Sequence, residues 1–357
     1  MQLGMRIHST YETISHKTHM HNEKIFDNLS GIMVLYKPKG ETSRATLNRL
    51  QRAVRSYGRH GTKVRVGHAG TLDPLAEGVL IACVGKATKL IEVIQMLPKC
   101  YAATFQLGVA SDTEDADGTV VPLLNPPRPT REMLYEAASR FVGRIRQRPP
   151  AYSALKIAGK RAYQLARQGE HVELIAREID VYRIELAGYE YPVFRLKIEC
   201  GSGTYVRSLG RDIGESLGSG AIMMALIRER IGQFSLSDAV PPDMFDDLQA
   251  ATWRERIMPL ELGVAHLPRV DLDAKAAARL LMGQKVRKDE IPDLQMSSEN
   301  CSATNARLFA AFAQNNRLVS LLELVDGQHV KIKKNFVVRP TFPENDWSSE
   351  DSQPIGP

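Results

Sequence analysis

The residues best suited to chemistry surround a single acid, Asp73, within residues 67–74 (Gly-His-Ala-Gly-Thr-Leu-Asp-Pro). Pro74 has a fixed φ and disfavours helical angles at the preceding residue, so we expect an extended backbone at Asp73. An isolated Asp-Pro pair usually marks a turn. The glycines and the histidine around this acid instead indicate a stiff loop, which holds a nucleophile or base at fixed geometry.

Two predicted strands and a helix would support this loop. The apolar run at 79–84 is typical of a strand buried on both faces. Residues 31–36 predict a second strand, after which Pro38 and Gly40 make a turn and Thr42 or Ser43 can cap a helix. The helix has an apolar face and an arginine face, made of Leu47, Leu50 and Val54 and of Arg49, Arg52 and Arg55.

Three more side chains are candidates for the same site. Residues 99–109 have strand composition, and composition alone favours a core position for Tyr101. Residues 204–209 are interpreted as a strand, which would project Tyr205 and Arg207 to the same side. A guanidinium fork matches a carboxylate, so Arg207 could hold Asp73 ionised and oriented; an exposed strand arginine is the equal alternative.

These motifs are similar to those of the TruB family, the tRNA pseudouridine(55) synthases. Residues 67–80 (Gly-His-Ala-Gly-Thr-Leu-Asp-Pro-Leu-Ala-x-Gly-Val-Leu) closely resemble its catalytic motif. Residues 37–43 (Lys-Pro-x-Gly-x-Thr-Ser) and 203–209 (Gly-Thr-Tyr-x-Arg-x-Leu) resemble two further family motifs. The site that the resemblance implies contains Asp73 as nucleophile, Tyr101 as the stacking residue and candidate base, Arg207 as orienting cation, Tyr205 in the pocket, His68 facing the RNA, and Leu226 as an apolar wall.

The resemblance also implies a fold and a reaction. The fold would be α+β, a pseudouridine synthase fold with a mixed, largely antiparallel central sheet, followed by a small β-rich PUA-like domain. The reaction would isomerise uridine 55 in the T arm of tRNA: the N1–C1′ bond breaks, the uracil turns over, and a C5–C1′ bond forms. The uridine leaves its stack first, at a cost of about a few kcal/mol. No cofactor and no metal is implied, and attack by Asp73 on the ribose or on the base stays open.

Two charged segments flank these motifs. Residues 111–118 (Ser-Asp-Thr-Glu-Asp-Ala-Asp-Gly) suggest a calcium loop, but its twelfth position would fall on Leu124, where an acid is required. The resemblance implies a structural turn there. Residues 143–169 carry seven bases and no acid, which favours contact with phosphates over a salt-bridged surface. The predicted RNA contacts are Lys37, Arg65, Arg146, Arg148, Tyr152, Lys156 and Lys160.

Composition bounds the organisation of the 357 residues. Residues 1–30 are polar and are interpreted as a disordered extension, 31–265 as the catalytic domain, and 266–340 as the PUA-like domain. A polar insert at 288–305 breaks the pattern of the last domain, and Asp326-Gly327 predicts a hairpin turn within it. The tail 341–357 contains four acids and no base and is expected to be disordered, which leaves the rest of the chain more basic than the net charge of +6.

Several classes of protein are disfavoured. The four cysteines have no paired spacing, and no apolar run is long enough to span a bilayer, so we expect a cytoplasmic protein without a membrane segment. The predicted partner is tRNA, bound by a monomer that needs no protein partner. Two rivals are a guide-RNA-dependent synthase, disfavoured by Pro-Leu-Ala after Asp73, and a non-catalytic RNA-binding or tRNA-folding protein on the same scaffold.

Overall fold

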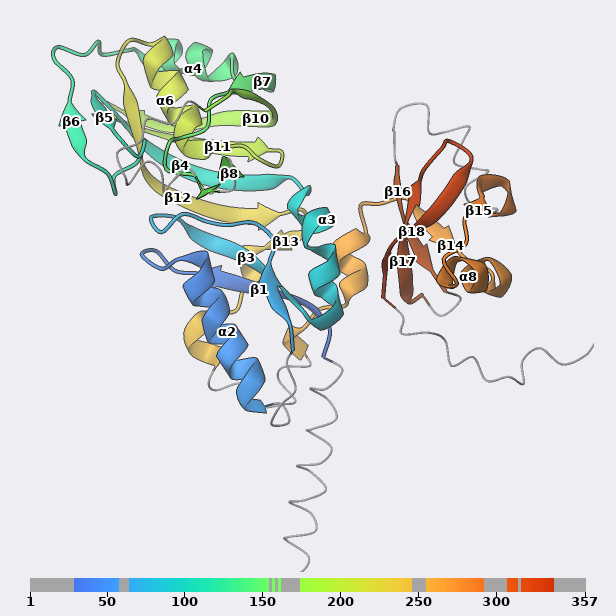
Figure 1. The fold of residues 1–357 in the computed structure, drawn as a ribbon. Coiled ribbons are helices and arrows are strands. Elements are labelled where there is room, and N and C mark those ends of the chain that lie inside the picture. The colour runs from blue at the N-terminus through green and yellow to red at the C-terminus, as the bar shows by residue number, and fades with distance from the viewer. Residues whose placement is uncertain are drawn as a thin grey trace, which may run out of the picture. The chain divides into compact units, whose positions relative to one another are not determined.

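The computed structural model describes residues 29–57, 64–153, 156–157, 160–161, 174–245, 255–291, 307–313 and 316–336. The chain splits into two compact units between Pro259 and Leu260 (Figure 1), whereas the sequence analysis places the boundary after residue 265. Each unit is described by itself. The predicted disordered extension up to residue 28, most of the polar insert and the acidic tail lie outside the described residues. No helix among the described residues is long and apolar enough to cross a membrane.

The first unit is built on a nine-stranded mixed sheet with the order β1-β3-β12-β4-β11-β10-β7, in which β2 pairs with β3 and β13 with β12. Only β3 and β12 run parallel; the other pairs are antiparallel. The strands of this sheet are β1 (Gly31–Lys37), β2 (Val66–His68), β3 (Glu77–Val84), β4 (Lys99–Leu107), β7 (Gly143–Gln147), β10 (Arg177–Glu190), β11 (Val193–Cys200), β12 (Ala221–Ile231) and β13 (Phe234–Ser235). Two small hairpins pair β5 (Val109–Ser111) with β6 (Val120–Pro122) and β8 (Lys156–Ile157) with β9 (Lys160–Arg161).

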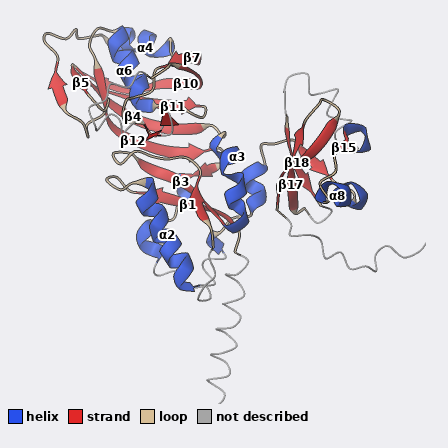
Figure 2. Cartoon of the chain, in the orientation of Figure 1, coloured by secondary structure: helices blue, strands red, loops and turns tan. Residues whose placement is uncertain are grey.

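In the described part of this unit, the sheet is accompanied by the α-helices α2 (Ser43–Tyr57), α3 (Ile91–Gln95), α4 (Arg131–Ser139) and α6 (Val206–Ser216) (Figure 2). Short 3₁₀ helices cover Gly85–Leu90, Leu236–Asp238 and Pro242–Phe245. The predicted amphipathic helix is confirmed in α2, whose Leu47, Leu50 and Val54 are fully buried in one cluster with residues of β1 and β3. The predicted strands at 31–36, 79–84 and 99–109 correspond to β1, β3 and β4.

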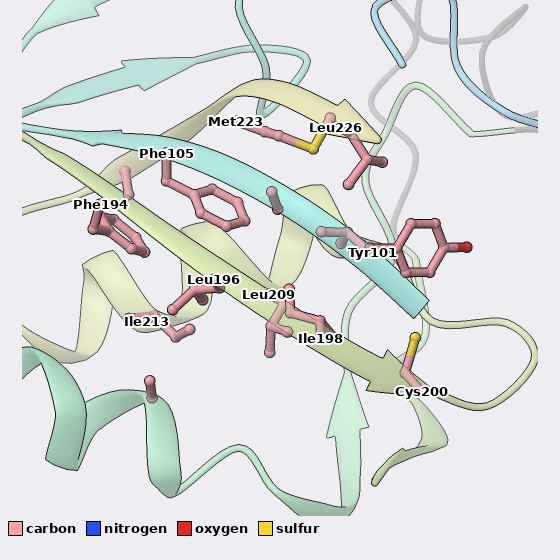
Figure 3. Packing of buried hydrophobic residues seen from close by; sticks show 14 of the residues in the cluster. Tyr101, Phe105, Phe194, Leu196, Ile198, Cys200, Leu209, Ile213, Met223 and Leu226 are labelled. Atoms are coloured by element: carbon pink, nitrogen blue, oxygen red, sulfur yellow. The ribbon is translucent and has the colours of Figure 1, made fainter. Parts of the chain in front are cut away.

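A second apolar cluster joins β4, β11 and β12 to α4 and α6 (Figure 3). Phe105 and Phe194, on adjacent strands, stack with their ring centroids 5.0 Å apart. Tyr101 lies at the end of the same β4 face, and Figure 3 shows its hydroxyl pointing away from the cluster. The packed row of β4 therefore fixes where this phenol leaves the core.

The predicted strand at 204–209 is wrong. Tyr205 has extended angles and caps α6, which begins at Val206. Val206, Leu209 and Ile213 are buried at helical spacing, and packing of this apolar face outweighs the strand preference of a β-branched and an aromatic residue. Arg207 consequently projects from the first turn of a helix.

The second unit contains a five-stranded sheet in the order β14-β16-β17-β18-β15, in which β14 and β16 are parallel. Its elements are β14 (Arg269–Asp271), α8 (Ala274–Leu281), β15 (Val286–Arg287), β16 (Leu308–Phe312), β17 (Leu318–Leu324) and β18 (His329–Asn335), with 3₁₀ helices at Leu260–Val264 and Lys288–Glu290. The predicted hairpin at Asp326-Gly327 is confirmed, since it joins β17 to β18 with Gly327 at φ +79°. The apolar side of α8 packs into the core of this unit.

Candidate active site

The loop that carries Asp73 connects β2 to β3 and is held from two sides through its backbone. The Ser43 hydroxyl, at the start of α2, accepts a hydrogen bond from Leu72 N at 2.8 Å and donates one to Leu72 O at 2.9 Å. Gly40 N donates to Pro74 O at 2.8 Å. The turn and helix predicted from residues 38–43 thus place their polar groups on both neighbours of Asp73.

Lys37 also holds this loop, which corrects its assignment as an RNA contact. Its side chain is 0% exposed, and its ammonium donates to the carbonyls of Pro38, Pro74 and Ala76. Burial lowers the pKa of Lys37 to about 8, and the Asp73 carboxylate opposes this shift. A buried ammonium committed to three carbonyls is part of the scaffold and is withheld from phosphates.

Arg207 lies between two carboxylates. Its Nε is 2.9 Å from Asp73 Oδ2, and its Nη1 is 3.4 Å from Asp115 Oδ2. The remaining donors are used by backbone, since Nη1 donates to Thr113 O at 2.7 Å and Nη2 to Tyr152 O at 3.1 Å. The fork is therefore shared among several groups. Its Nε–H is not aligned for a hydrogen bond to Asp73, so that contact is an ion pair.

The acidic turn after β5 holds α6 at two successive turns of the helix. Asp115 pairs with Arg207, and Glu114 pairs with Arg211 and accepts a hydrogen bond from Ser208 at 2.6 Å. Burial raises the pKa of both acids, while the arginines oppose the rise. The family resemblance implied that this turn is structural. The turn also supplies Asp115, which is the second carboxylate paired with Arg207.

Two cavities meet at Asp73. The smaller, of about 270 Å³, is lined by Asp73, Tyr101, Tyr205, Arg207 and Leu226 among others. The wider, of about 1100 Å³, is lined by Asp73 and Arg207 again, together with residues of the acidic turn and Tyr152. The Asp73 side chain is 37% exposed, whereas that of Arg207 is 5% exposed. The Asp73 carboxylate is thus accessible from both cavities, whereas the Arg207 side chain that pairs with it is almost fully buried.

The aromatic residues of the smaller cavity differ in their surroundings. Tyr101 is 8% exposed, and burial raises its pKa to about 12, so its hydroxyl is protonated at neutral pH. Gln147 holds the backbone of Tyr205 by two hydrogen bonds, and the Arg177 guanidinium carbon lies 5.1 Å from the Tyr205 ring centroid. The protonated Tyr101 hydroxyl can donate a hydrogen bond. To act as a base it would first have to lose its proton, which the raised pKa opposes.

His68 lines the wider cavity beside Asp73. Its Nδ1 is buried and has no hydrogen-bond partner among the described residues. Burial holds the pKa of His68 below its ordinary value, and the charges of Arg228 and Arg44 act in the same direction. A neutral imidazole therefore faces the space next to the acid.

Three of the remaining predicted RNA contacts are exposed. Arg65 is exposed before β2, and Arg146 and Arg148 are exposed at the end of β7. Lys156 and Lys160 belong to the β8–β9 hairpin, and their side chains lie outside the described part of the chain.

Sequence reasoning missed Asp115, Lys99 and Arg228 as members of the site. Lys99 and Arg228 are both nearly fully buried and line the smaller cavity. Their sequence signal is weak, because Lys99 is the first residue of β4 and Arg228 is followed in β12 by the charged residues Glu229 and Arg230.

Lys37 generates a prediction about stability and pH. Its pKa is about 8 in the folded chain and 10.5 as the ordinary value, so between these pH values the unfolded chain binds the extra proton. The free energy of unfolding attributable to Lys37 must then rise with pH over this window. We expect the wild type to gain on the order of 1 kcal/mol relative to Lys37→Met between pH 8 and 10, measured by urea unfolding. The exposed neighbour variant Lys39→Met should follow the wild-type curve, and parallel curves for all three proteins would contradict the prediction.

Comparisons with known proteins identify the family of the chain. Residues 58–206 match the family model described as TruB family pseudouridylate synthase (N terminal domain). The tRNA pseudouridine synthase B of Dehalococcoides mccartyi strain CBDB1 is 42% identical over 267 residues, which cover 74% of this chain and 86% of the relative. The protein of the same name from Xanthomonas campestris pv. campestris strain 8004 is 38% identical over 285 residues, covering 79% and 90%.

Solved structures show the same fold. A chain of the Cbf5-Nop10-Gar1 complex matches with a TM-score of 0.65 and 24% identity, over 88% of this chain and 87% of that one. The archaeal box H/ACA sRNP Nop10-Cbf5 complex matches with a TM-score of 0.63. The mixed sheet and the separate β-rich unit are therefore a pseudouridine synthase fold with a PUA-like domain. With identities of about 40% over most of its length, the chain belongs to the TruB family of pseudouridine synthases.

Proposed function

We propose that the protein converts uridine 55 in the T arm of tRNA to pseudouridine, with Asp73 as the nucleophile. The protein is a tRNA pseudouridine synthase by its relatives, and therefore an isomerase. One observation carries the assignment of the site: an accessible carboxylate, ion-paired to the buried Arg207, lies where the cavity of Tyr101 and Leu226 joins a wider one. In this proposal the extruded uridine occupies the smaller cavity and its neighbours occupy the wider one.

Each side chain then has a task that its position suits. The Tyr101 ring, from β4, would stack on the uracil. Leu226, from the neighbouring strand β12, would form an apolar wall of the same pocket (Figure 3). Arg207 would hold the Asp73 carboxylate in a fixed position, which lowers the cost of bringing nucleophile and substrate together. The isomerisation breaks the N1–C1′ bond and forms the C5–C1′ bond; the proton lost from C5 balances the proton gained at N1.

We further propose that the protein acts as a cytoplasmic monomer without a guide RNA, a cofactor or a protein partner. The relatives at about 40% identity are named for tRNA, whereas the Cbf5 structures are complexes with other proteins and share only the fold at this level of identity. Light scattering of the purified protein tests whether it is a monomer. Its activity on a bare tRNA transcript tests whether it needs a guide RNA, a cofactor or a protein partner.

The first functional prediction concerns Asp73. Asp73→Asn should abolish pseudouridine formation because an amide is not a nucleophile, while tRNA affinity stays within about tenfold of the wild type. Pseudouridine mapping on an unmodified transcript, with purified protein alone, measures the product. A transcript with cytidine at position 55 is the substrate control, and turnover by Asp73→Asn near the wild-type rate would refute the assignment.

Arg207 should be needed for the chemical step and for stability. Arg207→Lys keeps a charge but loses the planar fork, so we expect a single-turnover rate at least ~100-fold lower. Arg207→Ala also leaves the buried Asp115 carboxylate without its cationic partner, which should lower the free energy of unfolding by about 3–5 kcal/mol. Arg183→Lys, on the exposed part of β10, is the matched control. If Arg207→Lys reacts at the wild-type rate per bound tRNA, the ion pair has no catalytic importance.

Arg146 and Arg148 should contact phosphates. Replacing both with glutamine should weaken binding of every tRNA similarly and reduce the slope of log affinity against log salt by about one per lost contact. Filter binding between low and moderate salt measures the slope, with Arg183→Gln as the control. An unchanged slope would show that these arginines only face solvent.

A further inference from the structure

Arg228, in β12, is a buried cation that the proposed chemistry has not yet used. It is 2% exposed and lines the smaller cavity, opposite Tyr101 in the pairing of β12 with β4. Its guanidinium forms no ion pair with a carboxylate in the part of the chain that the structure describes. It donates hydrogen bonds to three backbone carbonyls, and its side chain also forms a hydrogen bond with that of Tyr101. Burying such a charge is costly, so it requires a specific reason.

Three hydrogen bonds from Arg228 to backbone carbonyls lie on either side of Asp73 in the sequence. Its Nη2 donates to Gly70 O at 3.0 Å and its Nη1 to Thr71 O at 3.3 Å, both ahead of the acid. Its Nε donates to Val79 O at 2.7 Å, in the strand that follows the acid. One rigid, planar group therefore ties both ends of the Asp73 loop to β12.

The backbone is shaped to allow this contact. Gly78 has φ +110°, and a Cβ there would lie 2.4 Å from Arg228 O, so only glycine lets β3 and β12 approach so closely. Lys37 and Ser43 hold the loop from the β1 and α2 side, whereas Arg228 is the contact from the side of Tyr101 and Leu226. On the side of the predicted uridine, Arg228 therefore holds the backbone of the loop, whereas Arg207 holds the Asp73 side chain.

We propose that Arg228 is a positioning residue for the isomerisation, which fixes the Asp73 loop against the strand that forms the uridine pocket. This inference rests on the proposed function, since it sets the Asp73 carboxylate in register with a base stacked on Tyr101. Burial is the main cause of the lowered pKa of Lys37, Lys99 and His68, and the charge of Arg228 acts in the same direction on all three.

Arg228→Lys tests the proposal, because it keeps the charge but cannot reach three carbonyls with one planar group. The matched control is Arg230→Lys on the same strand, where the side chain is 41% exposed and pairs with Glu199. We expect the single-turnover rate at saturating tRNA, expressed per bound tRNA, to fall ~100-fold in Arg228→Lys, with tRNA affinity unchanged. Amide hydrogen exchange across residues 69–79 should accelerate in Arg228→Lys and not in the control.

The outcomes separate the possibilities. If Arg228→Lys reacts at the wild-type rate per bound tRNA, the proposal is overturned. A variant that only has a smaller folded fraction would give this result, because unfolded protein binds no tRNA and does not enter the rate. Unchanged exchange across 69–79 would overturn it as well. If the wild type forms no pseudouridine at all, the proposed function fails, while the exchange measurement still decides whether Arg228 anchors the loop.

Discussion

The site depends on one arginine shared between two acids. Arg207 is buried, so its charge must be compensated within the protein, and Asp115 and Asp73 provide that compensation at 3.4 and 2.9 Å. Asp115 is itself buried, whereas Asp73 is accessible from both cavities. The buried acid anchors the cation, and the cation holds the accessible acid in place. Only Asp73 is therefore free to meet a substrate.

The loop that carries Asp73 is held by cations and a hydroxyl that bind its backbone. Lys37, Ser43 and Arg228 reach the loop from β1, α2 and β12. Backbone carbonyls are fixed by the fold, so hydrogen bonds to them transmit the rigidity of the sheet to the loop and leave the Asp73 carboxylate available. Preorganisation of this kind is what a reaction requires when the nucleophile must meet a base removed from its stack.

Burial gives the side chains of the pocket well-defined protonation states. It raises the pKa of Tyr101 to about 12 and lowers that of His68, so at neutral pH the phenol keeps its proton and the imidazole is uncharged. Lys37 and Lys99, each with a pKa lowered to about 8 by burial, remain largely protonated. The ammonium groups of Lys37 and Lys99 are thus positive charges that contact backbone carbonyls, whereas Tyr101 and His68 are uncharged.

The amino-acid sequence was sufficient to single out the Asp73 loop and to predict the strands β1, β3 and β4, the helix α2 and the β17–β18 hairpin. In these segments, local pattern and turn chemistry agree with the fold, and the loop motif is long enough to identify the family. It misplaced Arg207 on a strand because Thr204, Tyr205 and Val206 have strand preferences, whereas packing of Val206, Leu209 and Ile213 makes a helix. Three features could be seen only in the folded structure. Lys37 is buried, and Asp115 is the second carboxylate paired with Arg207. Arg228 forms hydrogen bonds with backbone carbonyls that lie 149 to 158 positions earlier in the sequence. A charge's partner, and whether it is buried, depend on contacts between distant segments, and no local pattern encodes them.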